Sequence, residues 1–285
     1  MEPFDVVLPL KSEFEGRGSD LRRCRTGLLP SIVCAGAHKH IRTFHIICPK
    51  AEMRVVEAML SEFGSYFDFA LRPDDDLICS PILEGQFQKS GLYIQQLIKL
   101  QAARLVNTPH YMTLDADILL RANFAAFLER HEDAIPYHQE PATLHRNWWR
   151  ASARVLRHFR AMKGDVMGVT PEFLITDVVR DLIDRLQNLA GRRGNDNWQI
   201  HLMIAACRSS LTWSEYSLYW TYFSKSYRGP HKHEASRIYD YCGTKERALQ
   251  AIRSANPAPV MIAQSSSIGL DAFDDVVHAL GITHN

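Results

Sequence analysis

Short apolar runs alternate with helical patterns over the first part of the chain. Three runs bounded by turn residues, at 4–10, 43–49 and 111–117, are typical of buried strands. Between them, 51–64 and 91–106 carry apolar positions at helical period, which predicts two helices, the second capped by Ser90. Strands that alternate with helices indicate βαβ units. The pattern therefore predicts an α/β fold with a mostly parallel sheet flanked by helices.

The rest of the chain has a more helical pattern. We expect a short strand over 164–170, helices over 171–191, 197–210 and 214–227, and a last strand over 258–267. Residues 11–36 are expected to form a loop and a helix with exposed arginines, and 71–81 a charged loop. No Pro-, Gly- or Ser-rich linker interrupts the pattern. We therefore predict one domain, 1–285, with lobes of about 1–120 and about 121–285.

Composition limits the function classes. Lys and Arg number 33 against 32 for Asp and Glu, and this balance argues against a nucleic-acid-binding protein. The N-terminus has acidic residues where a secretory signal would have basic ones, and no apolar run approaches the length of a membrane-spanning helix. The six cysteines form no CxxC or Cys/His finger spacing, which favours reduced thiols. A cytoplasmic protein is expected.

A basic amphipathic segment over 146–164 leaves two interpretations open. Trp148, Val155, Phe159 and Met162 are spaced for one apolar face, and arginines lie mostly elsewhere. Such a helix can lie on an anionic membrane surface or pack against its own domain. We favour packing and keep peripheral contact with the inner membrane surface as the alternative.

The stretch YMTLDADILL places two aspartates inside an apolar run. In an extended segment Asp115 and Asp117 would point to the same side, with the small Ala116 turned away. Two converging carboxylates repel each other unless a cation lies between them. A divalent cation with oxygen ligands fits, and Mg²⁺ often adds substrate phosphates to one or two carboxylates. The alternative is that both aspartates form a solvated turn or cap the helix expected over 122–131.

This strand-terminal Asp-x-Asp resembles the signature of GT-A-fold glycosyltransferases. More of the chain is similar to a largely uncharacterised bacterial glycosyltransferase-like family, with its Gln-Gln-Leu-x-Lys-Leu helix before the acidic strand and its later Glu-Tyr segment, here SEYSLYWTYF. The resemblance is most specific over about 85–120. It implies that Asp115 and Asp117 hold Mn²⁺ or Mg²⁺ on the diphosphate of a nucleotide sugar, with Asp115 also near the ribose. It further implies transfer to a hydroxyl of a glycan, such as a cell-surface polysaccharide.

The resemblance also suggests donor-binding residues. Gln95, Gln96 and Lys99 would face the sugar or diphosphate, with Lys99 as a point cation on phosphate. Lys11 and Ser12 follow the first strand, where the loop lies close to the nucleotide in this fold. The alternatives are an exposed helix flank for the first group and an ordinary connecting loop for the second.

Two further residues have competing interpretations. Glu215 is a candidate general base on the acceptor side, because inverting GT-A enzymes place an Asp or Glu at a helix start there. Thr212 and Glu215 also match a capping box, which would explain the glutamate by itself. His233, in GPHKHEAS, is a candidate third metal ligand, although a histidine in a polar loop is more often solvated.

Two other functions remain open at this point. A nucleotidyltransferase also joins an α/β sheet to metal-binding acids, but PLKSEFEGRGSD lacks a convincing glycine-rich phosphate loop. A non-catalytic module that binds nucleotide or sugar would keep the fold without the chemistry. The intact Asp-x-Asp favours the transferase.

Overall fold

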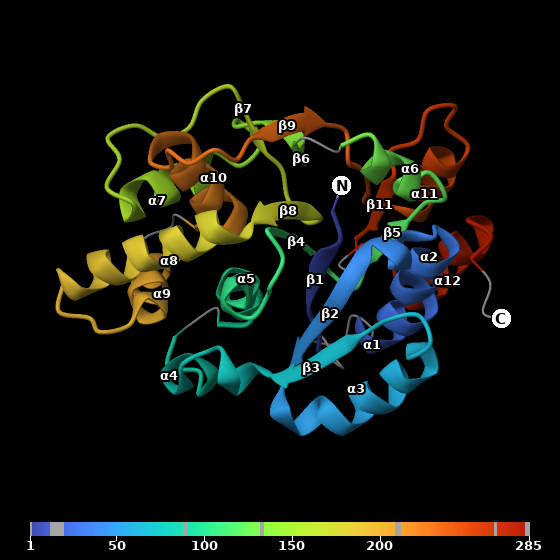
Figure 1. The fold of residues 1–285 in the computed structure, drawn as a ribbon, viewed down its shortest axis with the longest axis horizontal. Helices are drawn as coiled ribbons and strands as arrows, with labels where there is room; N and C mark the ends of the chain where they lie inside the picture. The colour runs from blue at the N-terminus through green and yellow to red at the C-terminus, as the bar shows by residue number, and fades with distance from the viewer. Residues whose placement is uncertain are drawn as a thin grey trace.

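The computed structural model describes residues 2–11, 20–87, 90–131, 134–208, 212–264 and 267–282, and a mixed sheet in the order β3-β2-β1-β4-β8 lies at its centre (Figure 1). Its strands are β1 (Phe4–Pro9), β2 (Ile41–Cys48), β3 (Phe69–Pro73), β4 (His110–Thr113) and β8 (Glu172–Ile175). The pairs β1–β2, β2–β3 and β1–β4 are parallel, and β8 runs antiparallel to β4. The predicted α/β class with a mostly parallel sheet is confirmed.

Two smaller sheets adjoin the central one. The first has the order β10-β11-β5, from Tyr239–Cys242, Val260–Ala263 and Ile118–Leu120. The second has the order β7-β6-β9, from Asp165–Met167, Ile135–Pro141 and His233–Ser236. Since β5 follows β4 after a short turn, the chain leaves the central sheet for the first small sheet at the aspartate pair.

Helices cover both faces of the central sheet. On one side lie α4 (Ser80–Leu83), α5 (Ser90–Gln101), α8 (Thr176–Gly191), α9 (Trp198–Arg208) and α10 (Glu215–Lys225), and on the other α1 (Asp20–Arg23), α2 (Leu29–Cys34), α3 (Met53–Leu60) and α12 (Leu270–Ala279) (Figure 1). The other helices are α6 (Phe124–Glu129), α7 (Arg146–Val155) and α11 (Lys245–Ile252). An apolar core lies on each face of the central sheet. Strand β1 is buried on both faces and contributes side chains to both cores.

Several local predictions were wrong. Glu172–Ile175 is strand β8, and the helix expected from residue 171 begins only at Thr176. Phe69–Pro73 forms β3 at the edge of the sheet, where a loop was expected. Arg23 is fully buried, although the arginines around it were expected at the surface. Each of these positions depends on neighbours far along the chain.

The basic amphipathic segment packs against the domain. Helix α7 ends at Val155, so Phe159 and Met162 do not extend its apolar face, and Phe159 is fully exposed. Trp149 is buried, and Ser152 Oγ lies 2.7 Å from Ser217 Oγ of α10.

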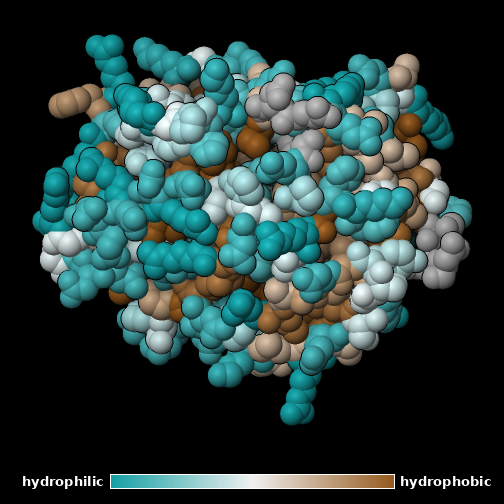
Figure 2. Space-filling view, in the orientation of Figure 1, coloured by the Kyte–Doolittle hydropathy of each residue, from teal (hydrophilic) through white to brown (hydrophobic). Residues whose placement is uncertain are grey.

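The face in Figure 2 is mainly polar, with apolar residues visible chiefly in its recesses. In the described part of the chain, no helix has the length and apolarity needed to cross a bilayer.

Candidate active site

A cavity of about 330 Å³ lies at the carboxyl ends of β1 and β2. Its walls come from the ends of the two strands, from Asp74 and from α5, including Lys11, Gly91, Ile94 and Gln95. Ligands of open α/β sheets bind at the carboxyl ends of the strands, and this volume is at the lower end of the range for small-molecule sites. Lys11 and Gln95 thus border a cavity, and their role in donor binding stays a prediction. Ser12 lies outside the described residues.

The aspartate pair lies in a turn after β4. The strand ends at Thr113, and the backbone N–H of Ile118 donates to the carbonyl of Asp115 at 3.3 Å. The carbonyl of Asp117 accepts from the backbone N–H of Ala263 at 2.9 Å, which fixes the turn to β11. Ala116 is buried and both aspartates are partly exposed. The predicted extended geometry is therefore wrong, but the pair does lie at the carboxyl edge of the sheet.

Lys99 is at the centre of a buried network. Its Nζ lies 2.8 Å from Asp115 Oδ1, 3.2 Å from Glu215 Oε1 and 2.7 Å from Thr170 Oγ1. An ammonium group has three N–H donors, and these three oxygens use all of them. Burial alone would lower the pKa of Lys99, but the carboxylates of Asp115 and Glu215 help to raise it well above the usual value. Lys99 is thus a fixed cation that orients two acids, and the predicted contact with phosphate does not fit this geometry.

Glu215 is the first residue of α10 and is buried beside Lys99. The helix is capped by Ser214, whose side chain accepts from the Ser217 backbone while Ser217 Oγ accepts from the Ser214 backbone. The capping box predicted for Thr212 and Glu215 is therefore wrong, and another reason is needed for a carboxylate at this position. Burial raises the pKa of Glu215, and the charge of Lys99 opposes this shift.

The neighbouring Tyr216 ties the network to the sheet. Its hydroxyl lies 2.7 Å from Thr113 Oγ1 and 2.6 Å from Thr170 Oγ1. Gln96 is also buried here on α5, and its Oε1 has no hydrogen-bond partner in the described residues. The predicted group of Gln95, Gln96 and Lys99 is thus divided: Gln95 borders the cavity, while the other two are buried in the wall.

Asp20 and Arg23, which sequence reasoning did not single out, are charged side chains near the aspartate pair. Burial raises the pKa of Asp20 to about 6, and the charges of Asp117 and Asp115 add to the shift. Burial lowers the pKa of Arg23, which the charges of Asp117 and Asp20 oppose, and its Nη2 donates to the Ile268 carbonyl at 2.6 Å. No motif marks either residue, because their partners are distant in sequence.

The charged groups around Asp115 and Asp117 indicate whether a cation could bind there. Three partly desolvated aspartates repel one another here, and Lys99 is already shared with Glu215. Within the described ranges, no three acidic, histidine or cysteine side chains converge as a ready-made metal cage. Mg²⁺ and similar ions commonly take one or two carboxylates and complete their shell with water and substrate phosphates. Asp115 and Asp117 fit a cation site of this open kind.

The predicted third ligand, His233, does not fit. Its Nδ1 lies 3.0 Å from the Ile135 carbonyl, so that nitrogen must donate. Its Nε2 lies 2.7 Å from the Tyr219 hydroxyl and is therefore the acceptor. Burial lowers the pKa of His233 to about 3, which keeps the ring neutral. With both nitrogens engaged, His233 has no lone pair to offer a metal.

The fold is that of GT-A glycosyltransferases. Mouse xyloside xylosyltransferase 1, in its apo form, is similar with a TM-score of 0.54 and 13% identity, over 93% of this chain and 98% of that one. The galactosyltransferase LgtC, in complex with donor and acceptor sugar analogs, gives 0.50 and 13% over 99% and 98%. WbbM, a bifunctional glycosyltransferase, gives 0.52 and 9% over 98% of this chain and 50% of its own. At such identities the likeness establishes the fold alone.

Sequence comparison adds a family without a known activity. No curated protein matches the chain. A family model described as "Family of unknown function (DUF6492)" matches residues 1–255. The predicted Gln-Gln-Leu-x-Lys-Leu signature is not part of that description and stays a prediction. Because the match spans most of the sequence, the chain belongs to the DUF6492 family.

Proposed function

We propose that the protein is a metal-dependent glycosyltransferase that moves a sugar from a nucleotide-diphosphate donor to a hydroxyl of a glycan, with a cell-surface polysaccharide as one possible acceptor. The observation that carries the proposal is the acidic turn at the end of β4, beside a cavity at the ends of β1 and β2. Lys11 of the cavity wall is close enough to Asp20 for its charge to lower the pKa of that aspartate, and Asp115 and Asp117 act on the same carboxyl. Since β1 and β4 are parallel neighbours that end at the same edge of the sheet, we take the cavity and the acidic turn as one site.

Each residue then has a defined task. The cavity would take the nucleoside, with Gln95 and Lys11 at its border. Asp115 and Asp117 would hold Mn²⁺ or Mg²⁺, and such a cation stabilises the negative charge that develops on a leaving diphosphate. Lys99 would orient Asp115 through the 2.8 Å contact. Gln96, predicted to face the donor, is buried and does not line the cavity, so we assign it no contact with the donor.

For Glu215 we propose a positioning role in place of the predicted base. Its side chain is 5% exposed and faces Lys99, which leaves little surface for an acceptor hydroxyl. A general base must lie within hydrogen-bond reach of the proton that it removes. Glu215 instead contacts the ammonium group of Lys99, as Asp115 does. It therefore helps to fix the position of that ammonium group beside Asp115.

Calorimetry with nucleoside diphosphates tests the donor site. Wild-type protein should bind at least one of them with Mn²⁺ and much more weakly without it. Asp115→Asn and Asp117→Asn should remove the metal-dependent part of nucleoside-diphosphate binding and leave the circular dichroism spectrum unchanged. Asp184→Asn, on the exposed face of α8, is the matched control. Release of nucleoside diphosphate from a nucleotide sugar in the presence of acceptor then tests transfer. Equal Mn²⁺-dependent binding by wild type and both site variants would refute the proposal.

A further inference from the structure

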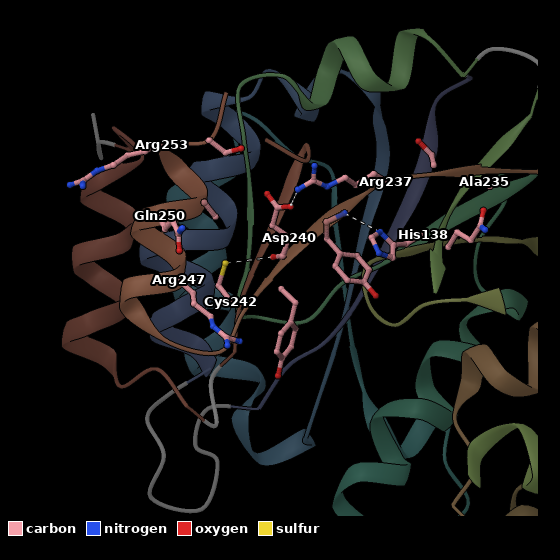
Figure 3. Close-up of a pocket in the computed structure, with 14 residues that line it drawn as sticks. His138, Ala235, Arg237, Asp240, Cys242, Arg247, Gln250 and Arg253 are labelled. Carbon is pink, nitrogen blue, oxygen red and sulfur yellow. Dashed lines mark hydrogen bonds and ion pairs between the residues drawn. The ribbon is translucent and has the colours of Figure 1, made fainter. Parts of the chain in front are cut away.

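A second and larger cavity, of about 1130 Å³, lies between β6, β10 and α11. Its lining includes His138, Arg237, Asp240, Tyr241, Arg247 and Arg253 (Figure 3). The arginines come from two places, Arg237 just before β10 and the other two from α11 and its end. None of these residues belongs to the donor cavity at the ends of β1 and β2.

The lining carries an excess of positive charge. Asp240 is its one acid, and both carboxylate oxygens already have donors: Arg121 Nη1 at 2.6 Å and the Ala258 backbone N–H at 3.2 Å on one oxygen, and Arg237 on the other. Among the described residues, neither Arg247 nor Arg253 has a carboxylate within ion-pair distance. Two guanidinium groups thus line the cavity without a counter-charge.

The histidine in the lining adds no charge of its own. Burial lowers the pKa of His138 to about 4, and the charge of Arg237 contributes to the shift. The ring is therefore neutral at pH 7, stacks on Tyr239 with centroids 3.7 Å apart and accepts from the Ile238 backbone N–H at 3.1 Å. The cavity offers flat aromatic and polar surface in addition to the arginines, a combination suited to a sugar that carries an acid group.

Backbone hydrogen bonds connect the lining of this cavity to the acidic turn. Strand β10 pairs with β11, with Cys242 opposite Ala263, and the Ala263 N–H donates to the Asp117 carbonyl. Burial raises the pKa of Tyr241 in the lining, and the charge of Asp117 contributes. The lining of this cavity is thus within electrostatic range of the proposed cation site and is joined to it by β11.

We propose that this cavity binds the acceptor and that the acceptor carries an anionic group, either a carboxylate or a phosphate, which Arg247 binds and Arg253 assists. This inference rests on the proposed function and specifies the class of acceptor. A guanidinium offers paired N–H donors that match both anions in geometry and charge. Such a group would hold a growing acidic glycan so that its next hydroxyl faces the donor.

Binding of defined probes tests the proposal without requiring turnover. Titration calorimetry would compare tetragalacturonate with its neutral counterpart galactotetraose, and galactose 6-phosphate with galactose. At least one acidic probe should bind more tightly than its neutral partner, and salt should weaken that preference. Arg247→Gln should lower the affinity for the acidic probe by about tenfold or more, as expected for loss of a charge-assisted hydrogen bond. The affinity for the neutral probe should not change. Arg192→Gln, exposed at the end of α8, is the matched control.

The outcomes separate this inference from the donor assignment. Nucleotide binding with Mn²⁺ but no preference for either acidic probe would overturn the acceptor proposal and leave the transferase standing. An Arg247-dependent acidic preference without nucleotide binding would support the anion site and refute the donor site. Arg247-dependent binding to phosphatidylglycerol vesicles, with no binding of the soluble probes, would overturn the glycan assignment in favour of a membrane surface.

Discussion

Replacement of Lys99 by methionine tests the buried network most directly. Lys99 is 4% exposed and Glu215 5%, so the substitution leaves a buried carboxylate without its cation, while Asp115 is 37% exposed and can turn to water. Loss of one partner of a buried ion pair costs about 3–5 kcal/mol. At roughly 2–4 °C per kcal/mol for a protein of this size class, the melting temperature should fall by about 6–20 °C near neutral pH.

The pKa shifts of Glu215 and Lys99 determine how the loss of stability in Lys99→Met should change with pH. Burial already raises the folded-state pKa of Glu215 above its ordinary value of 4.5, and removal of Lys99 should raise it further. An acid with a raised folded-state pKa destabilises the fold as pH rises through that pKa. Lys99 itself, with a pKa raised well above 10.5, contributes stability at every lower pH. The stability difference between wild type and Lys99→Met should therefore be smallest near about pH 5 and widen toward about pH 9.

Urea unfolding and thermal melts over that pH range measure the effect. The matched control is Lys50→Met, because Lys50 forms an exposed pair with Asp75 at 3.6 Å, and such pairs contribute about 0–1 kcal/mol. In the double variant Lys99→Met/Glu215→Gln neither member of this buried pair carries a charge, so much of the lost stability should return. If Lys99→Met were as stable as Lys50→Met at every pH, the network described here would not exist in solution.

Three further substitutions test separate parts of the structure. Glu215→Gln should weaken Mn²⁺-dependent nucleotide binding through Asp115, whereas a base role would leave binding intact and slow transfer by about 10²- to 10⁴-fold. Gly91→Phe should block the donor cavity without loss of stability, since a Cβ there meets no atom within 4 Å, and Gly91→Ala, assayed by the same nucleotide titration, should still bind. Gly168→Ala should destabilise the fold by about 1–3 kcal/mol in urea unfolding, because its Cβ would lie 2.5 Å from the Tyr239 hydroxyl, whereas Gly243→Ala, at 3.6 Å from its nearest neighbour, should not.

The central strands could be predicted because burial on both faces leaves a continuous apolar run. Strand β1 is buried along its whole length, and its predicted range of 4–10 differs from the observed one by a single residue, whereas β4, equally buried, ends at Thr113 and not at residue 117. Strand β8 was missed for the opposite reason: its apolar residues run directly into the buried face of α8, and no turn residue separates them. Strand β3 was missed because, at the sheet edge, its side chains are only partly buried and carry no strong pattern.

The acidic turn could be predicted for a reason that did not depend on its detailed geometry. Asp115 and Asp117 stand out because carboxylates interrupt an apolar run, whether the backbone there is strand or turn. The sharing of Lys99 between Asp115 and Glu215 could not be predicted, since Glu215 comes from a helix far along the chain. The sequence likewise gives no sign of Asp20 and Arg23. The burial of Arg23 depends on a hydrogen bond to the carbonyl of Ile268, which is distant in the sequence.

The contacts of Lys99 differ from those that its place in the sequence suggests. From sequence it was a cation near phosphate, since it lies on the polar flank of a helix before an acidic strand. Tertiary contacts instead bury it and use every N–H on oxygens from three other elements of the chain. One cation cannot balance Asp115 and Glu215 together, and Asp117 and Asp20 add negative charge on the solvent side. The fold therefore gathers acidic side chains at the carboxyl edge of the sheet, and the proposed divalent cation, bound with a diphosphate, would balance their charge.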